Sequence, residues 1–241
     1  EGMRLFAERI GVSKADSWID YSVLEDCMRE HLNEVAPRRM AVLDPVKLVI
    51  ENYPEGREEL CDVPNHPQKP DWGKRQVPLT RELWIEREDF AETPPKGYFR
   101  LFPGNKVRLR YGYVVECTGY DPITGTVRCT YDPDTKSGTP GAEKVKVKGN
   151  IHWVSARHAC AAEVRLYDRL FKVPHPQGVE DLNPDSRKVI TAQLEPGLVN
   201  AKAEERFQFE RHGYFMTDPG SPGPGKPVFN RAVTLRDSWQ K

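Results

Sequence analysis

The sequence predicts a mainly β fold, either barrels or sandwiches, that follows a short helical segment. Twenty-one prolines and eighteen glycines gather in short clusters, which indicates many turns. Strand-like runs lie between these clusters, and short strands with regular turn signals are typical of barrels and sandwiches. The residues alone leave open whether the β part is one large barrel or two small ones.

Residues 1–36 form the predicted helical segment. Ser13 and Asp16 have the spacing of a capping box, in which side chains satisfy the first amides of a helix. The residues that then recur at helical spacing are Val23, Leu24, Cys27, Met28, His31 and Leu32. Because the residue before a proline avoids the helical conformation, the helix should end at Ala36, before Pro37.

From Arg39 onward the helical period gives way to short strands. The predicted strands cover residues 40–43, 46–50, 82–86, 106–116, 126–131, 144–154, 163–172, 187–193, 206–216 and 227–236. Turns are predicted where Gly and Pro cluster, at 121–125, 132–141 and 218–227.

Composition favours a folded protein of one or two domains in a reducing compartment. Acids and bases are balanced among the 30% of residues that are charged, so disorder is not indicated. Five cysteines without a CxxC pair indicate neither a disulfide framework nor a zinc site. This cysteine usage fits a reducing, cytoplasmic compartment, and no membrane-spanning run or signal peptide is found. The helical opening without an initiator methionine suggests a piece of a longer chain.

Residues 94–115 hold the most informative charge pattern. This stretch has no acid and five basic residues, namely Lys96, Arg100, Lys106, Arg108 and Arg110. In a strand, Arg108 and Arg110 would project from one face, and Val107, Leu109 and Tyr111 from the other. Guanidinium groups suit phosphates and base edges, so the pattern favours a β domain that binds RNA or DNA. The alternative is a merely solvated strand face, and the preceding residues 81–92 are rich in acids.

Other polar residues could contribute to the same surface. Arg38 and Arg39 follow the helix beside Asn33, and Gln208 alternates with two phenylalanines in the run FQFER at 207–211. Gln68 lies in the polar loop 65–68. Amide groups offer a paired donor and acceptor to base edges, although each residue taken singly also fits an ordinary polar loop or strand face.

Catalytic and metal-binding motifs are absent from the sequence. No GxSxG motif or cysteine-nucleophile context occurs, and no pair of acids is flagged as catalytic. The histidines, none in HxxxH spacing, are His31, His66, His152, His158, His175 and His212. Structural or surface roles are favoured for them, so we expect no catalytic residue and no metal site in this chain.

Several segments resemble the C-terminal half of glutaminyl-tRNA synthetase. They occur in the same order as in that family, and they are 32–56, 63–70, 107–120, 129–141, 147–171, 207–215 and 227–239. The most specific are IHWVSA at 151–156 and RLYDRLF at 165–171, which are not generic strand sequences. The resemblance covers essentially the whole chain.

The resemblance implies a layout of two small β-barrels like those of ribosomal proteins that bind 5S RNA. Residues 1–36 would end the helical connecting subdomain. Residues 37–93 together with 186–241 would form the proximal barrel, and residues 94–185 the distal barrel inserted into it. Barrels of this family hold the unpaired anticodon bases of the glutamine tRNA, whose splayed edges are open to readout.

The resemblance also implies a set of base-reading residues. Carried over by position, the set consists of Asn33, Arg38, Gln68, Arg100, Arg108, Arg110, Gln208 and Arg211. Arg38, Gln208 and Arg211 would form the pocket for the middle anticodon base. Arg100 would contact the third base, and Arg108 and Arg110 the first base and nearby phosphates.

Three positions depart from the bacterial pattern of the family. Gln68 stands where Asn is familiar, and Gly97 and Phe99 stand where Gln and Lys are familiar. Gln68 keeps the amide chemistry on a longer stem, whereas Phe99 could stack on a base instead of pairing with a phosphate.

The implied parent enzyme ligates glutamine to its tRNA with ATP. Its ATP-binding motifs are missing here, and Val12-Ser13-Lys14, a weak echo of one of them, falls in the helical region. We therefore expect this chain to be inactive alone and to bind neither ATP nor Mg. The expected partner is glutamine tRNA, without membrane or DNA contacts, and the chain is expected to be a monomer.

Two alternatives remain open from the sequence. The chain could belong to a glutamyl-tRNA synthetase of the archaeal or eukaryotic type, which shares these barrels. It could also be a stand-alone RNA-binding barrel module. The runs FQFER and IHWVSA favour the glutaminyl enzyme, and the helical lead-in at 1–36 argues against a stand-alone module.

Overall fold

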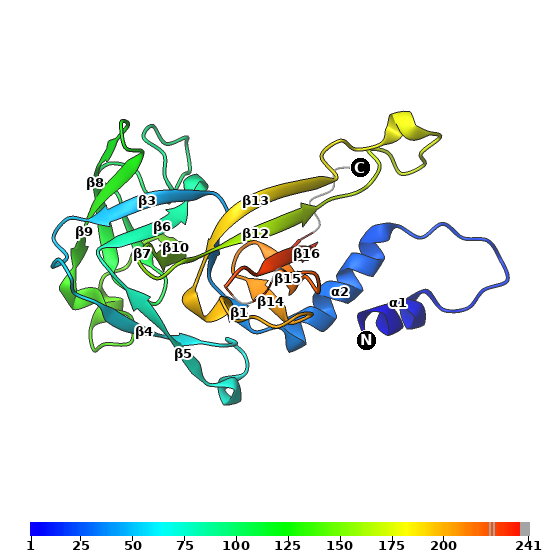
Figure 1. The fold of residues 1–241 in the computed structure, drawn as a ribbon, viewed down its shortest axis with the longest axis horizontal. Helices are drawn as coiled ribbons and strands as arrows, with labels where there is room; N and C mark the ends of the chain where they lie inside the picture. Colours follow the sequence, from blue (N-terminus) through cyan, green and yellow to red (C-terminus); the bar gives the residue numbers. More distant parts are fainter. Residues whose placement is uncertain (222, 224, 237–241) are drawn as a thin grey trace. The chain divides into compact units, whose positions relative to one another are not determined.

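A computed structural model describes residues 1–221, 223 and 225–236. Residues 222, 224 and 237–241 lie outside the described part, and with them the end of the expected segment 186–241 and of the quoted run 227–239. The chain forms two compact units (Figure 1). The first contains residues 1–39, 163–190 and 201 onward, and the second contains residues 40–162 and 191–200.

The first unit begins with two helices, α1 (Gly2–Ile10) and α2 (Tyr21–Val35), which a long loop connects (Figure 1). Helix α2 starts where the Asp20 carboxylate accepts a hydrogen bond of 2.9 Å from the backbone N–H of Ser22. Such a cap satisfies one of the amides that the first helical turn leaves without a partner. The helix ends at Val35, and Ala36 before Pro37 is extended, as predicted.

The predicted capping box at Ser13 is wrong. Gly11 takes a left-handed φ of 67° at the end of α1, and the chain then runs as a loop up to Asp20. Within this loop, the Ser13 hydroxyl accepts a hydrogen bond from Ala15 N at 3.1 Å, which caps no helix. Residues 1–36 are therefore helical in two separate pieces.

The first sheet follows the strand order β1-β14-β15-β16-β12-β13-β2. Its strands are β1 (Arg38–Arg39), β2 (Ala41–Val42), β12 (Cys160–Tyr167), β13 (Arg187–Leu194), β14 (Arg206–Phe209), β15 (Gly213–Thr217) and β16 (Val228–Thr234). Strand β13 runs from the first unit into the second, where its last residues pair with β2. Three aromatic rings fill the core beneath this sheet, with Phe209 stacked on Phe215 at 4.3 Å and in edge contact with Phe229.

The second sheet lies wholly in the second unit and follows the order β10-β7-β8-β9-β3-β6-β11. Its strands are β3 (Pro45–Ile50), β6 (Glu82–Glu86), β7 (Lys106–Leu109), β8 (Val114–Asp121), β9 (Thr126–Asp132), β10 (Gly149–Ile151) and β11 (Trp153–Ser155). Fully buried side chains such as Leu48, Leu83 and Trp153 pack inside it. Each seven-stranded sheet curves into a nearly closed barrel, which confirms the mainly β fold of two small barrels.

A two-stranded ribbon of β4 (Glu59–Pro64) and β5 (Lys74–Leu79) completes the second unit (Figure 1). Neither strand was predicted from the sequence. Their alternation is short, and Pro78 within β5 weakens the strand signal. Short 3-10 turns lie at Pro70–Trp72, Arg87–Asp89, Pro133–Thr135, Ala142–Lys144, Val179–Asp181 and Pro196–Leu198.

Two predicted strands are in fact hairpins. The run 106–116 divides into β7 and β8 at a turn in which Tyr111 has a φ of 65°, so Arg110 and Tyr111 do not extend the strand. The run 206–216 divides into β14 and β15 at a turn in which Arg211 has a φ of 73°. A left-handed conformation ends a strand, and the apolar pattern does not reveal it.

The strand pairing groups the chain differently from the expected barrel bounds of 37–93 with 186–241 and 94–185. Strands β3 and β6 pair with β9 and β11 respectively, so these two strands share one barrel with the strands of residues 106–155. Which unit corresponds to the proximal barrel and which to the distal one stays a prediction. Among the described residues, no helix is both long and apolar enough to cross a membrane.

Candidate nucleic-acid interface

In the first unit, the end of α2 and the short strand β1 bring predicted residues together. Strand β1 pairs in parallel with β14, and Arg38 lies opposite Gln208. Strand β14 pairs with β15, and Gln208 lies opposite Tyr214. Residues directly opposite one another share a face of the sheet. Arg38, Gln208 and Tyr214 therefore form a row across three strands, which we call the 38–208–214 row.

Arg38 is only 6% exposed, and its guanidinium group closes the end of helix α2. It donates to the carbonyl oxygen of Ala36 at 2.8 Å and to the side-chain Oδ1 of Asn33 at 2.6 Å. A cation at a helix C-terminus satisfies carbonyl groups that have no partner within the helix, and it favours the helix dipole. Arg38 thus fixes the orientation of the Asn33 amide.

Asn33 receives a second hydrogen bond, from the hydroxyl of Tyr214 at 3.3 Å. Its Oδ1 atom is therefore the acceptor for two neighbouring side chains. Tyr214 was not predicted from the sequence. Only its cross-strand position opposite Gln208 reveals its part in the cluster, and that position depends on the hairpin turn.

Gln208 lies on the face of β14 opposite to the buried rings of Phe207 and Phe209, as the alternation predicted. Its backbone N–H donates to the carbonyl oxygen of Pro37 at 2.9 Å, which anchors β14 beside β1. The side chain is half-buried. A fixed backbone below a partly exposed amide is suited to hydrogen bonding with a base edge.

Arg211 is half-buried in the turn after Gln208, with a left-handed φ of 73°. Non-glycine residues seldom adopt this conformation, which costs about 1 kcal/mol. The turn is closed by Gly213, where a Cβ atom would lie 2.5 Å from the carbonyl oxygen of Val233. Because Gly213 has no Cβ atom, β16 can approach it closely. The left-handed conformation of Arg211 makes the sharp bend of the turn.

In the second unit, Val107 and Leu109 are fully buried, as predicted for the apolar face of β7. Arg108 lies on the other face, half-buried. Its guanidinium donates to the carbonyl oxygens of Thr135 at 2.6 Å and Ala142 at 2.8 Å. Arg108 therefore organises the loop that follows β9.

The remaining arginines of the basic stretch also contact groups within the chain. Arg110 lies in the turn after β7, with its guanidinium 5.3 Å from the ring centre of Tyr111. Arg100 forms ion pairs with Glu88 at 2.9 Å and with the fully buried Asp89 at 2.5 Å. Burial disfavours the charged form of Arg100, but these carboxylates outweigh that effect and raise its pKa.

The acids of residues 81–92 thus neutralise part of the basic stretch. Lys106 likewise pairs with Glu116 at 3.2 Å. The stretch 94–115 is therefore not an unscreened basic surface over its whole length, because Arg100 and Lys106 have acidic partners.

Gln68 lies in the loop between β4 and β5, with an exposed side chain. Its backbone N–H donates to Nδ1 of the buried His66 at 3.1 Å, and the His66 ring makes an edge contact with Trp72. The loop is therefore held from within, while the Gln68 amide points to solvent.

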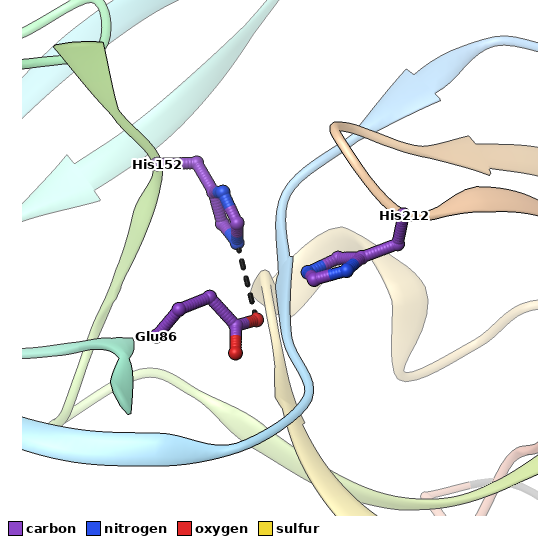
Figure 2. A group of neighbouring side chains, drawn as sticks. All are labelled: Glu86, His152 and His212. Carbon is purple, nitrogen blue, oxygen red and sulfur yellow. Dashed lines mark ion pairs between the residues drawn. The ribbon is translucent and has the colours of Figure 1, made fainter. Parts of the chain in front are cut away.

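His152 lies beside a carboxylate inside the second unit. It is fully buried, and its Nε2 atom lies 3.4 Å from the carboxylate of Glu86 (Figure 2). Glu86 in turn accepts hydrogen bonds from the backbone amides of Leu43 at 2.6 Å and Asp44 at 3.0 Å. The pair holds the β2–β3 connection against the barrel.

The structure thus presents amides, guanidinium groups and aromatic rings on fixed strands and turns. These groups can recognise bases and phosphates. Asn33, Arg38, Gln208 and Arg211 lie in the first unit, whereas Gln68, Arg100, Arg108 and Arg110 lie in the second.

Two family models match the chain, one at residues 36–132 and the other at residues 150–218. Both describe the anticodon-binding domain of class I tRNA synthetases (E and Q). The chain belongs to this family. The matched ranges include seven of the eight predicted residues, and only Asn33 lies outside them.

Curated proteins show the same relationship over the full length of this chain. It is 64% identical to the glutamine–tRNA ligases of Cupriavidus metallidurans and Ralstonia pickettii, and 59% identical to that of Nitrosomonas europaea. The alignments cover 100% of this chain but only 43%, 43% and 45% of those proteins. The chain therefore spans less than half the length of these relatives.

Proposed function

We propose that this chain recognises the anticodon loop of glutamine tRNA as the C-terminal part of a glutaminyl-tRNA synthetase. The full enzyme would ligate glutamine to its tRNA with ATP. The observation that carries the proposal is the cluster of Asn33, Arg38, Gln208 and Arg211 at the end of α2 and the β14 turn, in a chain of the anticodon-binding family.

The middle anticodon base would bind at the 38–208–214 row. The Gln208 amide offers one donor and one acceptor, and Arg211 offers a cationic fork at the neighbouring turn. Arg38 is held by Asn33 and Ala36, so its main contribution would be to position the Asn33 amide. Fixed donors lose little entropy on binding, which favours discrimination between bases.

Residues of the second unit would contact the other bases and the phosphates. Arg110 lies beside an aromatic ring, a setting that suits stacking with an unpaired base. Arg108 and Arg100 already contact carbonyl and carboxylate groups within the chain. Their guanidinium groups would contact tRNA in addition to these partners. Gln68 would reach a base with its exposed amide.

Glutamine is favoured over glutamate as the amino acid of the parent enzyme. The family models cover both kinds of synthetase, whereas the relatives at 59–64% identity are glutamine–tRNA ligases. We also propose that the chain is a monomer in the cytoplasm. Its five free cysteines, four of them buried, support a reducing compartment.

Binding of this chain to glutamine tRNA tests the proposal directly. Affinity would be measured by filter binding at roughly 50 and 200 mM salt, with the native tRNA and with its middle anticodon base changed. A preference of about tenfold or more for the native anticodon should persist at the higher salt, because base contacts depend little on counterion release.

The substitution Gln208→Ala should reduce this preference, while Gln177→Ala serves as the matched control. Gln177 is an exposed glutamine of the same unit that lies outside the cluster. Binding that ignores the middle base at both salt concentrations would contradict the proposed readout.

A further inference from the structure

The first unit contains a cleft of about 470 Å³ that the proposed anticodon contacts do not use. Three segments of this unit line it, namely the lead-in and first turn of α2, the segment after β12, and the last residues of β16. A cleft of this volume is large enough for a ligand or for several side chains of a partner.

Large apolar side chains are exposed at this cleft. Trp18 is 58% exposed, Leu170 57% and Tyr21 55%. Val173 and Tyr167, which also line it, are more than a third exposed. Single exposed apolar residues are common, but a group that surrounds one cleft marks a surface for binding protein or ligand.

The walls of the cleft are rigidly held. Arg169 lies over the ring of Tyr21 at 4.7 Å and forms an ion pair with Glu25 at 3.1 Å. Asn183 donates to the carbonyl oxygen of Arg169 at 3.0 Å, which fixes the segment after β12. A surface organised before binding needs little ordering when a partner arrives.

Arg231 presents a hydrogen-bond donor in this cleft. One of its terminal nitrogens donates to the carbonyl oxygen of Tyr167 at 3.0 Å, while its buried Nε has no hydrogen-bond partner among the described residues. Burial lowers the pKa of Arg231. A buried donor without an acceptor is costly, so an occupant that supplies an oxygen acceptor would bind favourably.

The charges that line the cleft disfavour RNA as the occupant. Three carboxylates line it, from Asp20, Glu25 and Asp168, against two guanidinium groups. Arg169 is already paired with Glu25. A polyanion would meet net negative charge here, whereas an apolar polypeptide segment would bury the exposed rings and leucine.

We propose that this cleft seats an apolar polypeptide segment with one carboxylate or carbonyl oxygen directed at Arg231, and that this segment belongs to the part of the relatives' longer chain outside the matched region. That part amounts to more than half of the relatives' length, since the matched region covers 43–45% of them. The inference rests on the proposed function only in that it takes this chain to work within such a longer enzyme.

Photocrosslinking in an intact enzyme tests the proposal. The chain would replace the matched region of the Cupriavidus metallidurans ligase, with Leu170→p-benzoylphenylalanine as the probe. Ile123→p-benzoylphenylalanine is the control, because Ile123 is 94% exposed and lies in the other unit. Illumination without tRNA, followed by peptide mapping, identifies the partner of each probe.

The Leu170 probe should crosslink to a peptide outside the 241-residue chain, with a yield at least five times that of the Ile123 probe. Adding Arg231→Gln should lower this yield several-fold. Crosslinks confined to the chain itself, equal yields from both probes, or crosslinks formed only with added RNA would each overturn the proposal. Because no tRNA is needed for the expected result, a failure here is distinct from a failure of anticodon discrimination.

Discussion

The guanidinium of Arg38 donates to the Oδ1 of Asn33 at 2.6 Å and thereby ties the last turn of α2 to the first residue of β1. Both residues were predicted as base readers, yet they also contact each other within the fold. The proposed middle-base pocket therefore depends on a contact that also stabilises the unit. Loss of stability and loss of recognition must be measured separately at these positions.

We expect Asn33→Ala to lower the free energy of unfolding by about 1–3 kcal/mol, because it leaves the buried Arg38 cation without one acceptor. Urea unfolding followed by circular dichroism measures this change. Asn150→Ala, at an exposed asparagine of β10, is the control and should change stability by less than about 0.5 kcal/mol. Equal effects of the two substitutions would show that the contact contributes little.

The left-handed turn residue Arg211 allows stability and function to be separated. Arg211→Gly should raise the free energy of unfolding by up to about 1 kcal/mol, since glycine adopts a φ of 73° without the Cβ penalty. The same substitution should weaken binding of glutamine tRNA, because the cation is lost. Urea unfolding and filter binding of the same protein give both quantities.

Glu204→Gly provides the matched control for this prediction. Glu204 is an exposed non-glycine residue with a φ of 63° in the turn that precedes β14. The Glu204→Gly substitution should raise the free energy of unfolding by a similar amount and leave the affinity for tRNA unchanged. A loss of affinity in both variants would point to a general effect of the turns and not to Arg211.

A substitution of Arg108 should affect mainly the loop that its guanidinium group supports. Its guanidinium bonds two carbonyl groups that lie 27 and 34 residues further along the chain. A lysine cannot make both contacts with the same geometry. We therefore expect Arg108→Lys to increase amide hydrogen exchange in residues 133–145, as measured by mass spectrometry, while exchange in β3 and β6 stays unchanged. Unchanged exchange in the loop would contradict this role.

The sequence predicted those features that depend on local patterns. The end of α2 before Pro37 and the buried face of Val107 and Leu109 follow from spacing alone. The hairpin turns at Tyr111 and Arg211 could not be predicted in this way, because neither residue type favours a left-handed conformation. Their presence shortens β7 and β14 and removes Arg110 from the strand.

The candidate site was predicted as a set of residue types, but not as a set of contacts. Arg100 and Arg108 were identified as basic, whereas their partners Asp89 and Ala142 come from other segments. Tyr214 was missed because only the pairing of β14 with β15 brings it opposite Gln208. Contacts between distant segments are set by the fold as a whole, which a single sequence pattern does not encode.

The carboxylate of Glu59 is the centre of a polar cluster in the second unit. It accepts hydrogen bonds from the hydroxyls of Tyr53 at 2.9 Å and Tyr113 at 2.8 Å, and from the ammonium group of Lys136 at 2.8 Å. Burial disfavours the charged carboxylate, but these hydrogen bonds outweigh it and hold the pKa of Glu59 below its usual value. Burial and the Glu59 charge raise the pKa values of both tyrosines.

This lowered pKa makes the cluster sensitive to acid. A carboxyl group with a lower pKa in the folded state stabilises the fold above its unfolded pKa, and this stabilisation is lost as the pH falls through the folded value. At neutral pH, we expect Glu59→Gln to lower the free energy of unfolding by about 3 kcal/mol, since three charge-assisted contacts are weakened. The difference between the variant and the native chain should shrink as the pH falls from 7 towards 3.

Urea unfolding at several pH values measures this difference, and Glu58→Gln supplies the control at the adjacent position. Glu58 contacts His158 near the surface at 2.6 Å, outside the tyrosine and lysine cluster. Its substitution should cost less than about 1 kcal/mol at neutral pH, as for an exposed ion pair. A constant difference between Glu59→Gln and the native chain across the whole range would mean that the Glu59 charge does not stabilise the fold, and that the cluster acts through packing alone.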